Sequence, residues 1–521
     1  MDPPDRHAEL TPHVSFDGGD LDCGNGLLLL IRKHIDPLPA GGLLEILSSE
    51  SSVREDLPAW CRLTGNEMVS LQAQGDRNSY LVSKGNYFNE HEQQPVSLTM
   101  QPDRGRAARR SMPVTQPICE VTIPETLPSP VDAPSIAPFS AMGIGSWPRP
   151  QWLLRTLHEY LQGRLSEAEF QEAANDAVRL CVDAQVRAGV DVLTDGEQRR
   201  DDYSSFVGAI LDNCQLIPIT DLLPYVDHPE EFAAALKDLD VPADKVRHPA
   251  VYGPLSRQRP LAVHELQFVQ SLSDAPVKVA LPGPYLLTRT MWMECISDRA
   301  YESREQLADD IVRVLREELH HLLANRAAIV QFDEPVLTEV VHGRSEMGNR
   351  TFMCGALGSK GSEAEELGFA ESLLGRVVTG LPWERLALHV CRGNWTTDES
   401  AALSGDYGPL LTYLSGVPVG TLFLETCTSR AGDLELLTAI PDDYRIGVGV
   451  INQKSSRIET VEEIEATIER AVKLLGAERI FVNPDCGFAT FADNPITAAR
   501  IAEAKLSHLA EAARRMRDKH C

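Results

Sequence analysis

From Ser135 to the C-terminus, short apolar runs rich in β-forming residues alternate with longer helical patterns. Helical periodicity fills segments such as 165–188, 304–325 and 460–475. The apolar runs are eight in number and end near Gly145, Thr194, Pro282, Phe332, Cys391, Glu425, Val450 and Asn483. Eight strand and helix repeats over nearly 390 residues predict an α/β fold, a (β/α)8 TIM barrel at residues 135–521, with its largest insertion at roughly 204–261.

The fifth run ends in two potential metal ligands one residue apart. On a strand, His389 and Cys391 point to the same face and can bind one ion together. Glu425 follows the sixth run and Cys486 the eighth. These four form a plausible tetrahedral zinc set, and the mixture of sulfur with imidazole disfavours calcium and magnesium. Two alternatives stay open. In the first, Cys427, two residues beyond Glu425, is a zinc ligand in place of Glu425. In the second there is no metal site: the cysteines are ordinary buried thiols and Glu425 is a surface charge.

Polar residues and glycines follow the other runs as well. They are Gly145-Ser146, Asp195-Gly196-Glu197, Pro282-Gly283-Pro284, Asp333-Glu334-Pro335 and Asn452-Gln453-Lys454. A single acidic residue after a strand, such as Asp195 or Glu334, is usually a helix cap. Recurrence at all eight strand ends favours an active site, because the chemistry of such barrels lies at the C-terminal ends of the strands.

Through most of residues 136–510, the sequence resembles the C-terminal catalytic barrel of cobalamin-independent methionine synthase and its shorter relatives. The resemblance is carried by Gly145-Ser146, Asp195-Gly196-Glu197, Asp333-Glu334-Pro335, His389-x-Cys391, Glu425-Thr426 and Asn483-Pro484-Asp485-Cys486-Gly487. It implies a role in methionine biosynthesis and a zinc ion bound by His389, Cys391, Glu425 and Cys486. It also implies that the amino and carboxylate ends of homocysteine are held by Ser146, Glu197 and Asp333.

The sequence departs from the family in two respects. Full-length members carry a second, N-terminal barrel that helps to hold a polyglutamylated folate, and here a small domain takes its place. The family's usual histidine after the seventh strand, a candidate proton donor, corresponds to Lys454. We expect Lys454 and Asp333 to be catalytic. Both departures leave the methyl donor open, with a folate and a corrinoid as candidates.

The predicted ligand set also indicates the type of reaction. Two thiolates and one carboxylate bring three negative charges to an ion that carries two, so a substrate thiol bound there is deprotonated near neutral pH yet stays nucleophilic. A free thiol, with a pKa of about 8.5, would be mostly protonated. We therefore predict a zinc-dependent methyltransferase acting on the thiol of homocysteine or a similar small molecule. The alternatives are another sulfur-centred alkyl or sulfur transfer on the same zinc barrel, and a non-catalytic adaptor.

Residues 14–87 form a second predicted domain. A helix is expected at Leu27–Ile35, a strand at Leu43–Leu47, a helix at 51–63 and a closing strand pair at 67–72 and 79–84. This order, with Leu21-Asp22, Arg32-Lys33 and Asp56-Leu57-Pro58-Ala59-Trp60-Cys61, resembles the TusA family of sulfur carriers, which implies a two-layer α/β domain.

The TusA family carries its sulfur on the cysteine of a Cys-Pro-x-Pro helix start. Here the corresponding stretch is Cys23-Gly24-Asn25-Gly26-Leu27, without either proline, so a docking or scaffold role competes with sulfur carriage by Cys23. Residues 88–134 are rich in Gln, Arg, Pro and Ser, and we expect them to form a linker.

The composition excludes several classes of partner. A formal net charge of −27 argues against electrostatic binding of nucleic acid or of an anionic membrane. The sequence has no apolar run long enough to span a membrane, and its N-terminus lacks the features of a signal peptide, so we expect a cytoplasmic protein. Eleven scattered cysteines do not suggest a disulfide framework.

Overall fold

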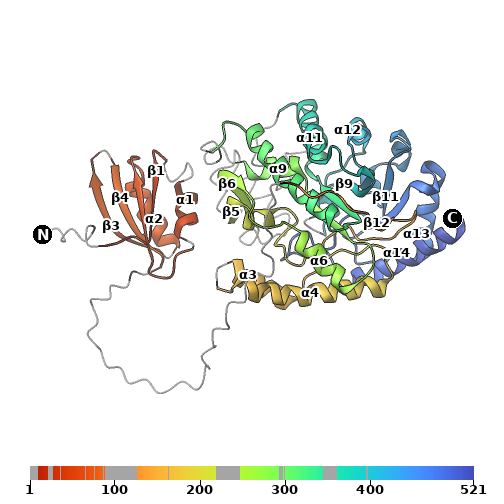
Figure 1. Ribbon diagram of the computed structural model, residues 1–521, viewed down its shortest axis with the longest axis horizontal. Helices are drawn as coiled ribbons and strands as arrows, with labels where there is room; N and C mark the ends of the chain where they lie inside the picture. Colours follow the sequence, from red (N-terminus) through yellow and green to blue (C-terminus); the bar gives the residue numbers. More distant parts are fainter. Residues whose placement is uncertain are drawn as a thin grey trace, which may run out of the picture. The chain divides into compact units, whose positions relative to one another are not determined.

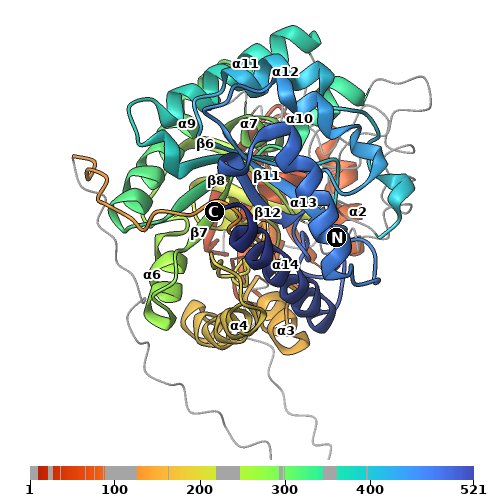
Figure 2. The same cartoon turned by 90° about the vertical axis from the view of Figure 1, so that its right-hand side faces the viewer.

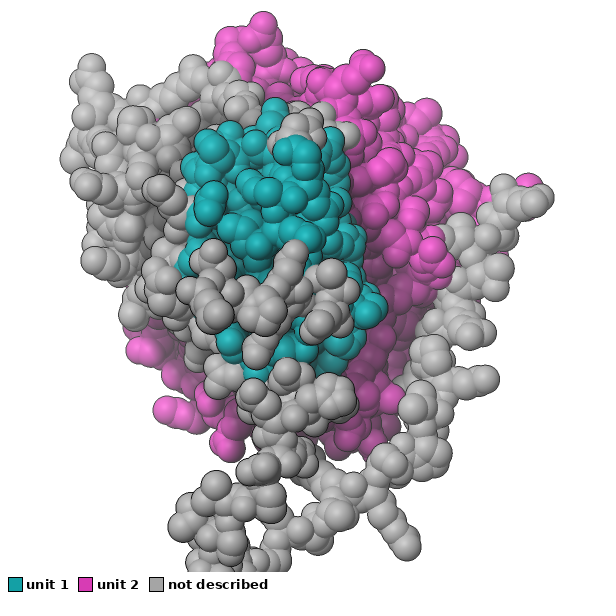
Figure 3. All heavy atoms as spheres, turned by 90° about the vertical axis from the view of Figure 1, so that its left-hand side faces the viewer, with its two compact units in different colours: residues 1–116 teal, residues 117–521 magenta. Residues whose placement is uncertain are grey.

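The computed structural model divides into two compact units, Met1–Gln116 and Pro117–Cys521 (Figures 1 and 3). It describes residues 7, 10–21, 27–35, 37–64, 66–75, 77–85, 87, 126–161, 164–218, 247–292, 297, 300–343, 361–394 and 397–521. Most of the predicted linker lies outside this set. Its last part belongs to the second unit, where the Val131 amide donates to the Leu323 carbonyl at 3.4 Å and Arg385 Nη1 donates to the Val131 carbonyl at 2.6 Å.

The first unit is a mixed four-stranded sheet with two helices. Its elements are β1 (Val14–Gly19), α1 (Leu27–Ile35), β2 (Leu43–Ser48), α2 (Val53–Thr64), β3 (Glu67–Gln74) and β4 (Arg77–Ser83). The strand order is β1-β2-β4-β3, with β1 and β2 parallel and the other pairs antiparallel. Apolar residues of both helices share one core with Leu44, Ile46, Tyr80 and Val82 of the sheet.

The sequence predicted both helices and the later strands of this unit, but not β1. Side chains of β1 alternate between partly buried and exposed positions with polar residues among them, which gives a weak strand signal. Cys23 lies outside the described residues.

The second unit contains a parallel sheet that closes on itself. Six strands run in the order β12-β11-β10-β9-β8-β7. Isolated parallel bridges join Ala141 to Val482, Met142 to Val192 and Leu193 to Val277, so two further segments complete the ring between β12 and β7. Figure 2 looks at this sheet with the helices around it. The strands are β7 (Lys278–Pro282), β8 (Ile329–Asp333), β9 (Leu386–Val390), β10 (Thr421–Leu424), β11 (Arg445–Ile451) and β12 (Ile480–Pro484).

The helices of this unit bury their apolar faces against the sheet and against one another. Capping boxes begin α4, α11 and α13 at Ser166, Ser362 and Thr460, so sequence-local signals fix three helix starts. The helices are α3 (Gln151–Leu161), α4 (Glu167–Ala188), α6 (Val263–Leu272), α7 (Pro284–Met291), α9 (Arg304–Ala324), α10 (Val336–His342), α11 (Glu363–Val378), α12 (Leu411–Gly416), α13 (Val461–Leu475) and α14 (Ala499–His520). Short 3-10 helices occupy Ser205–Ala209, Trp383–Arg385, Glu399–Ala401, Gly408–Leu410, Ser429–Ala431, Leu434–Ala439 and Ala477–Arg479.

The predicted insertion after the second strand contains an antiparallel pair, β5 (Asp212–Pro218) and β6 (Arg247–Ser256). The insertion predicted at roughly 204–261 therefore has secondary structure of its own. Within the part of the chain that the structure describes, none of the helices is long and apolar enough to span a bilayer.

Candidate metal and thiol site at the strand ends

Three predicted zinc ligands meet at the C-terminal ends of β9 and β12. His389 lies near the end of β9, Cys391 just after it, and Cys486 two residues beyond β12. One potential ligand atom from each lies within 4.8 Å of the others, and all three residues are buried. A hydrogen bond between the two thiols lowers the pKa of Cys391 and raises that of Cys486.

The two ring nitrogens of His389 have different surroundings. Nδ1 lies 2.9 Å from Oδ1 of Asp333, whereas Nε2 is buried and has no hydrogen-bond partner among the described residues. A buried imidazole with a carboxylate on one nitrogen and a bare second nitrogen is the arrangement found in metal-ligating histidines. With two sulfur atoms beside it, the group fits zinc well.

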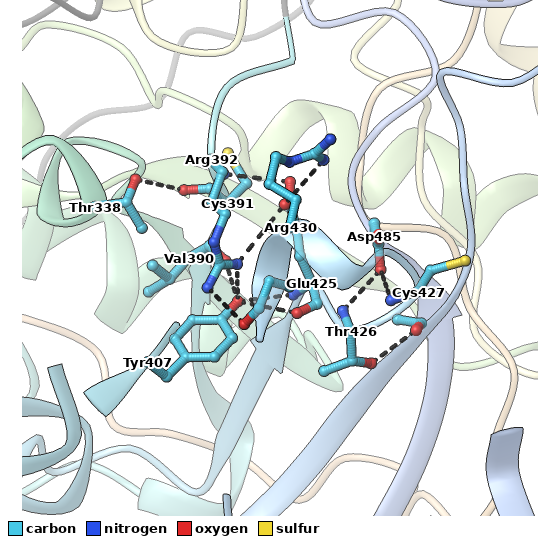
Figure 4. A network of polar contacts seen from close by, with 12 residues as sticks. Thr338, Val390, Cys391, Arg392, Tyr407, Glu425, Thr426, Cys427, Arg430 and Asp485 are labelled. Atoms are coloured by element: carbon cyan, nitrogen blue, oxygen red, sulfur yellow. Dashed lines mark hydrogen bonds and ion pairs between the residues drawn. The ribbon is translucent and has the colours of Figure 1, made fainter. Parts of the chain in front are cut away.

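Glu425, the fourth predicted ligand, lies outside this three-residue group. Its Oε1 accepts a hydrogen bond from the Arg392 amide at 3.2 Å, and its Oε2 lies 3.8 Å from Arg392 Nη1 and 3.6 Å from Arg430 Nη2 (Figure 4). The Tyr407 hydroxyl accepts from the Glu425 amide and from Arg392 Nη1. The carboxylate of Glu425 is thus compensated by two guanidinium groups of the protein.

The alternative ligand, Cys427, points its sulfur away from Cys391 (Figure 4). Strand β10 ends at Leu424, so the alternation expected to bring Cys427 to the same face as Glu425 does not continue that far. The Cys427 amide instead donates to Oδ1 of Asp485 at 3.0 Å.

One pocket contains the three-residue group together with all three predicted homocysteine-binding residues. It has a volume of about 540 Å³ including its open mouth. Among the residues that line it, those predicted from the sequence are Ser146, Glu197, Asp333, His389, Cys391 and Cys486. Lys454 is buried and does not line this pocket, and burial lowers its pKa.

Two glycines make room for the polar side chains of the pocket. A Cβ on Gly145 would lie 2.2 Å from Oε1 of Glu197, and one on Gly487 would lie 2.1 Å from Oγ of Ser146. Glu197 itself has a positive φ of 55°, and burial raises its pKa to about 7. The motifs that carry these glycines are therefore required by close packing around the site.

Other acidic residues at the strand ends bind backbone amides. Glu334 accepts hydrogen bonds from the Tyr285 and Leu286 amides, at 2.8 and 2.9 Å, at the start of α7, and burial raises its pKa to about 8. Oδ1 of Asp195 accepts from the Glu197 amide at 3.0 Å. Glu334 thus binds the first amides of α7, an earlier helix of the chain, and does not cap α10, the helix that follows it.

The sequence did not identify four residues that complete the pocket wall, namely Tyr203, Asn394, Thr490 and Phe491. They lie in loops after the second, fifth and eighth strands, where no periodicity marks them. Asn394 Nδ2 donates to the Gly487 carbonyl and to Thr490 Oγ1, both at 2.7 Å, so it ties two of the loops together.

The family model "Cobalamin-independent synthase, Catalytic domain" matches residues 139–353 and 389–514, more than half of the chain. The chain belongs to this family. It is therefore an enzyme of the cobalamin-independent methionine synthase family, whose members are methyltransferases. The matched segments contain the pocket residues described above.

Curated relatives of the family align over most of their length. A methionine synthase of Saccharolobus solfataricus is 26% identical over 377 residues, which cover 72% of this chain and 94% of that protein. Methionine synthases of Sulfolobus acidocaldarius and Thermococcus kodakarensis are 27% and 26% identical, and the alignments cover 66% of this chain and 84% and 85% of those proteins.

Two solved structures share the fold. A B12-independent methionine synthase of Shewanella sp. W3-18-1, in complex with selenomethionine, superposes with a TM-score of 0.55 at 24% identity, covering 74% of this chain and 99% of that one. A putative vitamin-B12 independent methionine synthase of Listeria monocytogenes gives 0.52 at 18% identity, covering 73% and 99%. These likenesses support a family barrel as the architecture of the second unit.

Proposed function

We propose that the protein is a zinc-dependent methyltransferase that transfers a methyl group to the thiol of homocysteine or of a similar small amino-acid thiol. The observation that carries the proposal is the single pocket in which the group of His389, Cys391 and Cys486 lies with the carboxylates of Glu197 and Asp333. A zwitterionic amino-acid thiol needs both: acidic partners for its ammonium group and a thiol-activating centre for its sulfur. The relatives named methionine synthase support the same reaction.

In this proposal the acceptor is oriented by three residues. Oε2 of Glu197 is buried without a hydrogen-bond partner among the described residues, and both hydrogen bonds to Asp333 end on its Oδ1. One oxygen of each carboxylate is thus left for an ammonium group, and the Ser146 hydroxyl, which accepts from the Ala489 amide at 3.3 Å, can donate its proton to the substrate carboxylate.

His389, Cys391 and Cys486 would hold the zinc, with Glu425 proposed as the fourth ligand. Bound there, zinc would lower the pKa of the substrate thiol and keep its sulfur nucleophilic. The Asp333 carboxylate accepts from Nδ1 of His389 and so leaves the lone pair on Nε2, the nitrogen that a metal would need. Lys454 is proposed to act beside this group, since its charge interacts with Glu425 and Cys486.

The first unit is proposed to be a TusA-like docking or regulatory domain. Its element order and its mixed sheet, with both helices in one core, support this comparison. A sulfur-relay role would require Cys23, which can be tested by mass spectrometry after incubation with a persulfide donor and by the turnover of Cys23→Ala. A mass gain at Cys23 with loss of turnover would favour sulfur transfer over methyl transfer.

The proposal is tested by measuring zinc content and then supplying homocysteine with different methyl donors. We expect one zinc per chain, and methionine formed from methylcobalamin, methyltetrahydrofolate or another methyl source, detected by mass spectrometry. A metal-free protein that binds no added zinc, or a zinc-loaded protein to which homocysteine does not bind in calorimetry, would contradict the proposal.

A further inference from the structure

A lysine and a glutamine are enclosed inside the barrel, on β7 and β8. Lys278 and Gln331 are both essentially inaccessible to solvent. Lys278 Nζ donates to Gln331 Oε1 at 2.7 Å and lies 4.2 Å from the centroid of the Phe423 ring. Enclosing an ammonium group in a barrel interior costs far more than enclosing an apolar side chain, so these two residues require an explanation.

The hydrogen bonds of this pair have a fixed direction. Charged or neutral, Lys278 has N–H groups to donate, and the Asp333 carboxylate at the other end of the chain only accepts, so Gln331 turns its oxygen toward Lys278. Its amide nitrogen then points the other way, and Nε2 donates to Oδ1 of Asp333 at 2.7 Å. Gln331 and Asp333 lie two residues apart on β8 and therefore point to the same side of the sheet.

The fixed direction of hydrogen bonding extends from Asp333 to His389. Asp333 and His389 are register partners on β8 and β9, and Oδ1 of Asp333 lies 2.9 Å from Nδ1 of His389. An ionised carboxylate only accepts hydrogen bonds, so in the neutral imidazole the proton is on Nδ1 and the lone pair is on Nε2. Nε2 is buried and has no hydrogen-bond partner among the described residues, and a nitrogen of this ring lies within 4.8 Å of the two cysteine sulfurs.

We propose that Lys278 and Gln331 are positioning residues that set the tautomer of His389 through Asp333. Lys278 fixes the orientation of the Gln331 amide, Gln331 fixes Asp333, and Asp333 holds the imidazole with its Nε2 lone pair toward Cys391 and Cys486. Without Lys278 the Gln331 amide loses the hydrogen bond that holds its oxygen, so its position and its Nε2 bond to the Asp333 carboxylate are no longer fixed. The carboxylate then loses its orientation toward His389.

A buried cation below the pocket has a second consequence. Burial lowers the pKa of Lys278 to about 7, and the negative charges of Asp333 and Glu197 act in the opposite direction. The hydrogen-bonded chain therefore also places a positive charge near the two carboxylates of the acceptor pocket.

The test compares Lys278→Met with a matched control, Lys505→Met. Lys505 is equally buried and its Nζ donates to the Glu459 carboxylate at 2.7 Å, but it has no connection to His389 in the described hydrogen bonds. In metal-free protein labelled with ¹⁵N-histidine at about pH 8, where a neutral imidazole predominates, the shifts of the two ring nitrogens report the tautomer. The His389 signals are identified by their absence in His389→Gln.

We expect wild type and Lys505→Met to show His389 protonated at Nδ1 alone, and Lys278→Met to show a mixture of tautomers. Zinc affinity, measured by competition with a chelator, should fall by about 10- to 100-fold in Lys278→Met, the usual effect of removing a residue that supports a metal ligand. Lys278→Gln keeps a donor for Gln331 and should restore the tautomer. If Lys278→Met does not fold, Gln331→Met removes the middle of the chain and carries the same expectation.

An unchanged His389 tautomer in Lys278→Met or Gln331→Met would overturn the proposal, even if stability fell. Equal losses of zinc affinity in Lys278→Met and Lys505→Met would overturn it as well. The zinc measurement rests on the proposed function, because it requires His389 to be a ligand, whereas the tautomer does not. If the protein binds no zinc, the tautomer measurement still shows whether Lys278 and Gln331 determine which ring nitrogen of His389 is protonated.

Discussion

Buried carboxylates on two sides of the barrel mouth have different surroundings. On the acceptor side, formed by Ser146, Glu197, Asp333 and His389, the Glu197 carboxylate has a buried oxygen without a hydrogen-bond partner among the described residues. On the arginine side, formed by Arg392, Tyr407, Glu425 and Arg430, Oε2 of Glu425 also has no hydrogen-bond partner among the described residues, but it lies 3.8 and 3.6 Å from two guanidinium groups. The acceptor side thus leaves negative charge for a ligand, whereas the arginine side balances it within the protein.

The proposed metal ligands lie where the two sides meet, and removing them should give the largest effect. We expect Cys391→Ser and Cys486→Ser to lose the single zinc ion on dialysis, because each removes one of three atoms that already lie within 4.8 Å of one another. Zinc content by mass spectrometry checks this. Cys427→Ser is the matched control, since its sulfur points away. Loss of zinc from the control but not from Cys391→Ser would reverse the ligand assignment.

The arginine side should be sensitive to removal of its carboxylate. Glu425→Gln leaves Arg392 and Arg430 buried without their shared partner, so the free energy of unfolding of the zinc-free protein should fall by about 3 kcal/mol or more. Urea denaturation measures this. Glu399→Gln removes a more exposed partner of Arg430 and should cost about 1 kcal/mol or less. Equal losses of unfolding free energy in Glu425→Gln and Glu399→Gln would mean that Glu425 is not held by these arginines. Full zinc retention in Glu425→Gln would exclude Glu425 as the fourth ligand.

The buried carboxylate of Glu197 on the acceptor side should make stability depend on pH. Burial raises the pKa of Glu197 from 4.5 to about 7, so between these values the native state holds a proton that the unfolded chain has released. Stability from this residue is therefore lost as pH rises, by up to about 3 kcal/mol. Glu197→Gln should be more stable than wild type at about pH 8 and similar at about pH 4.5 in urea denaturation of ligand-free protein. If Glu197→Gln were more stable than wild type by the same amount at both pH values, this expectation would be contradicted.

The affinity for the acceptor should show a smaller change. Asp333→Asn removes the charge proposed to pair with the substrate ammonium group, and homocysteine binding should weaken by about 10- to 100-fold, which calorimetry can measure. Zinc should stay bound at saturating concentration. The neighbouring Glu334→Gln is the control, because that carboxylate binds the amides at the start of α7 and should not alter thiol affinity. Unchanged affinity in Asp333→Asn would mean that the acceptor pocket is misassigned.

The sequence alone predicted the eight apolar runs of the barrel and the residues that follow them. Apolar runs and helical periods are local signals, and the ends of parallel strands meet at one end of a barrel, so His389, Cys391 and Cys486 could be expected together. Capping boxes and the glycines beside Glu197 and Ser146 are local signals of the same kind.

Only the tertiary structure decided which neighbours each side chain has. Glu425 lies beside Arg392, and Asp333 beside His389, because the register of adjacent strands and the course of the loops bring together residues tens of positions apart. Lys278 and Gln331 stand out in the sequence only as polar residues in apolar strands, and their direction of hydrogen bonding follows from the donors and acceptors they meet inside the barrel. Such pairings depend on packing across the whole sheet, which no short stretch of sequence specifies.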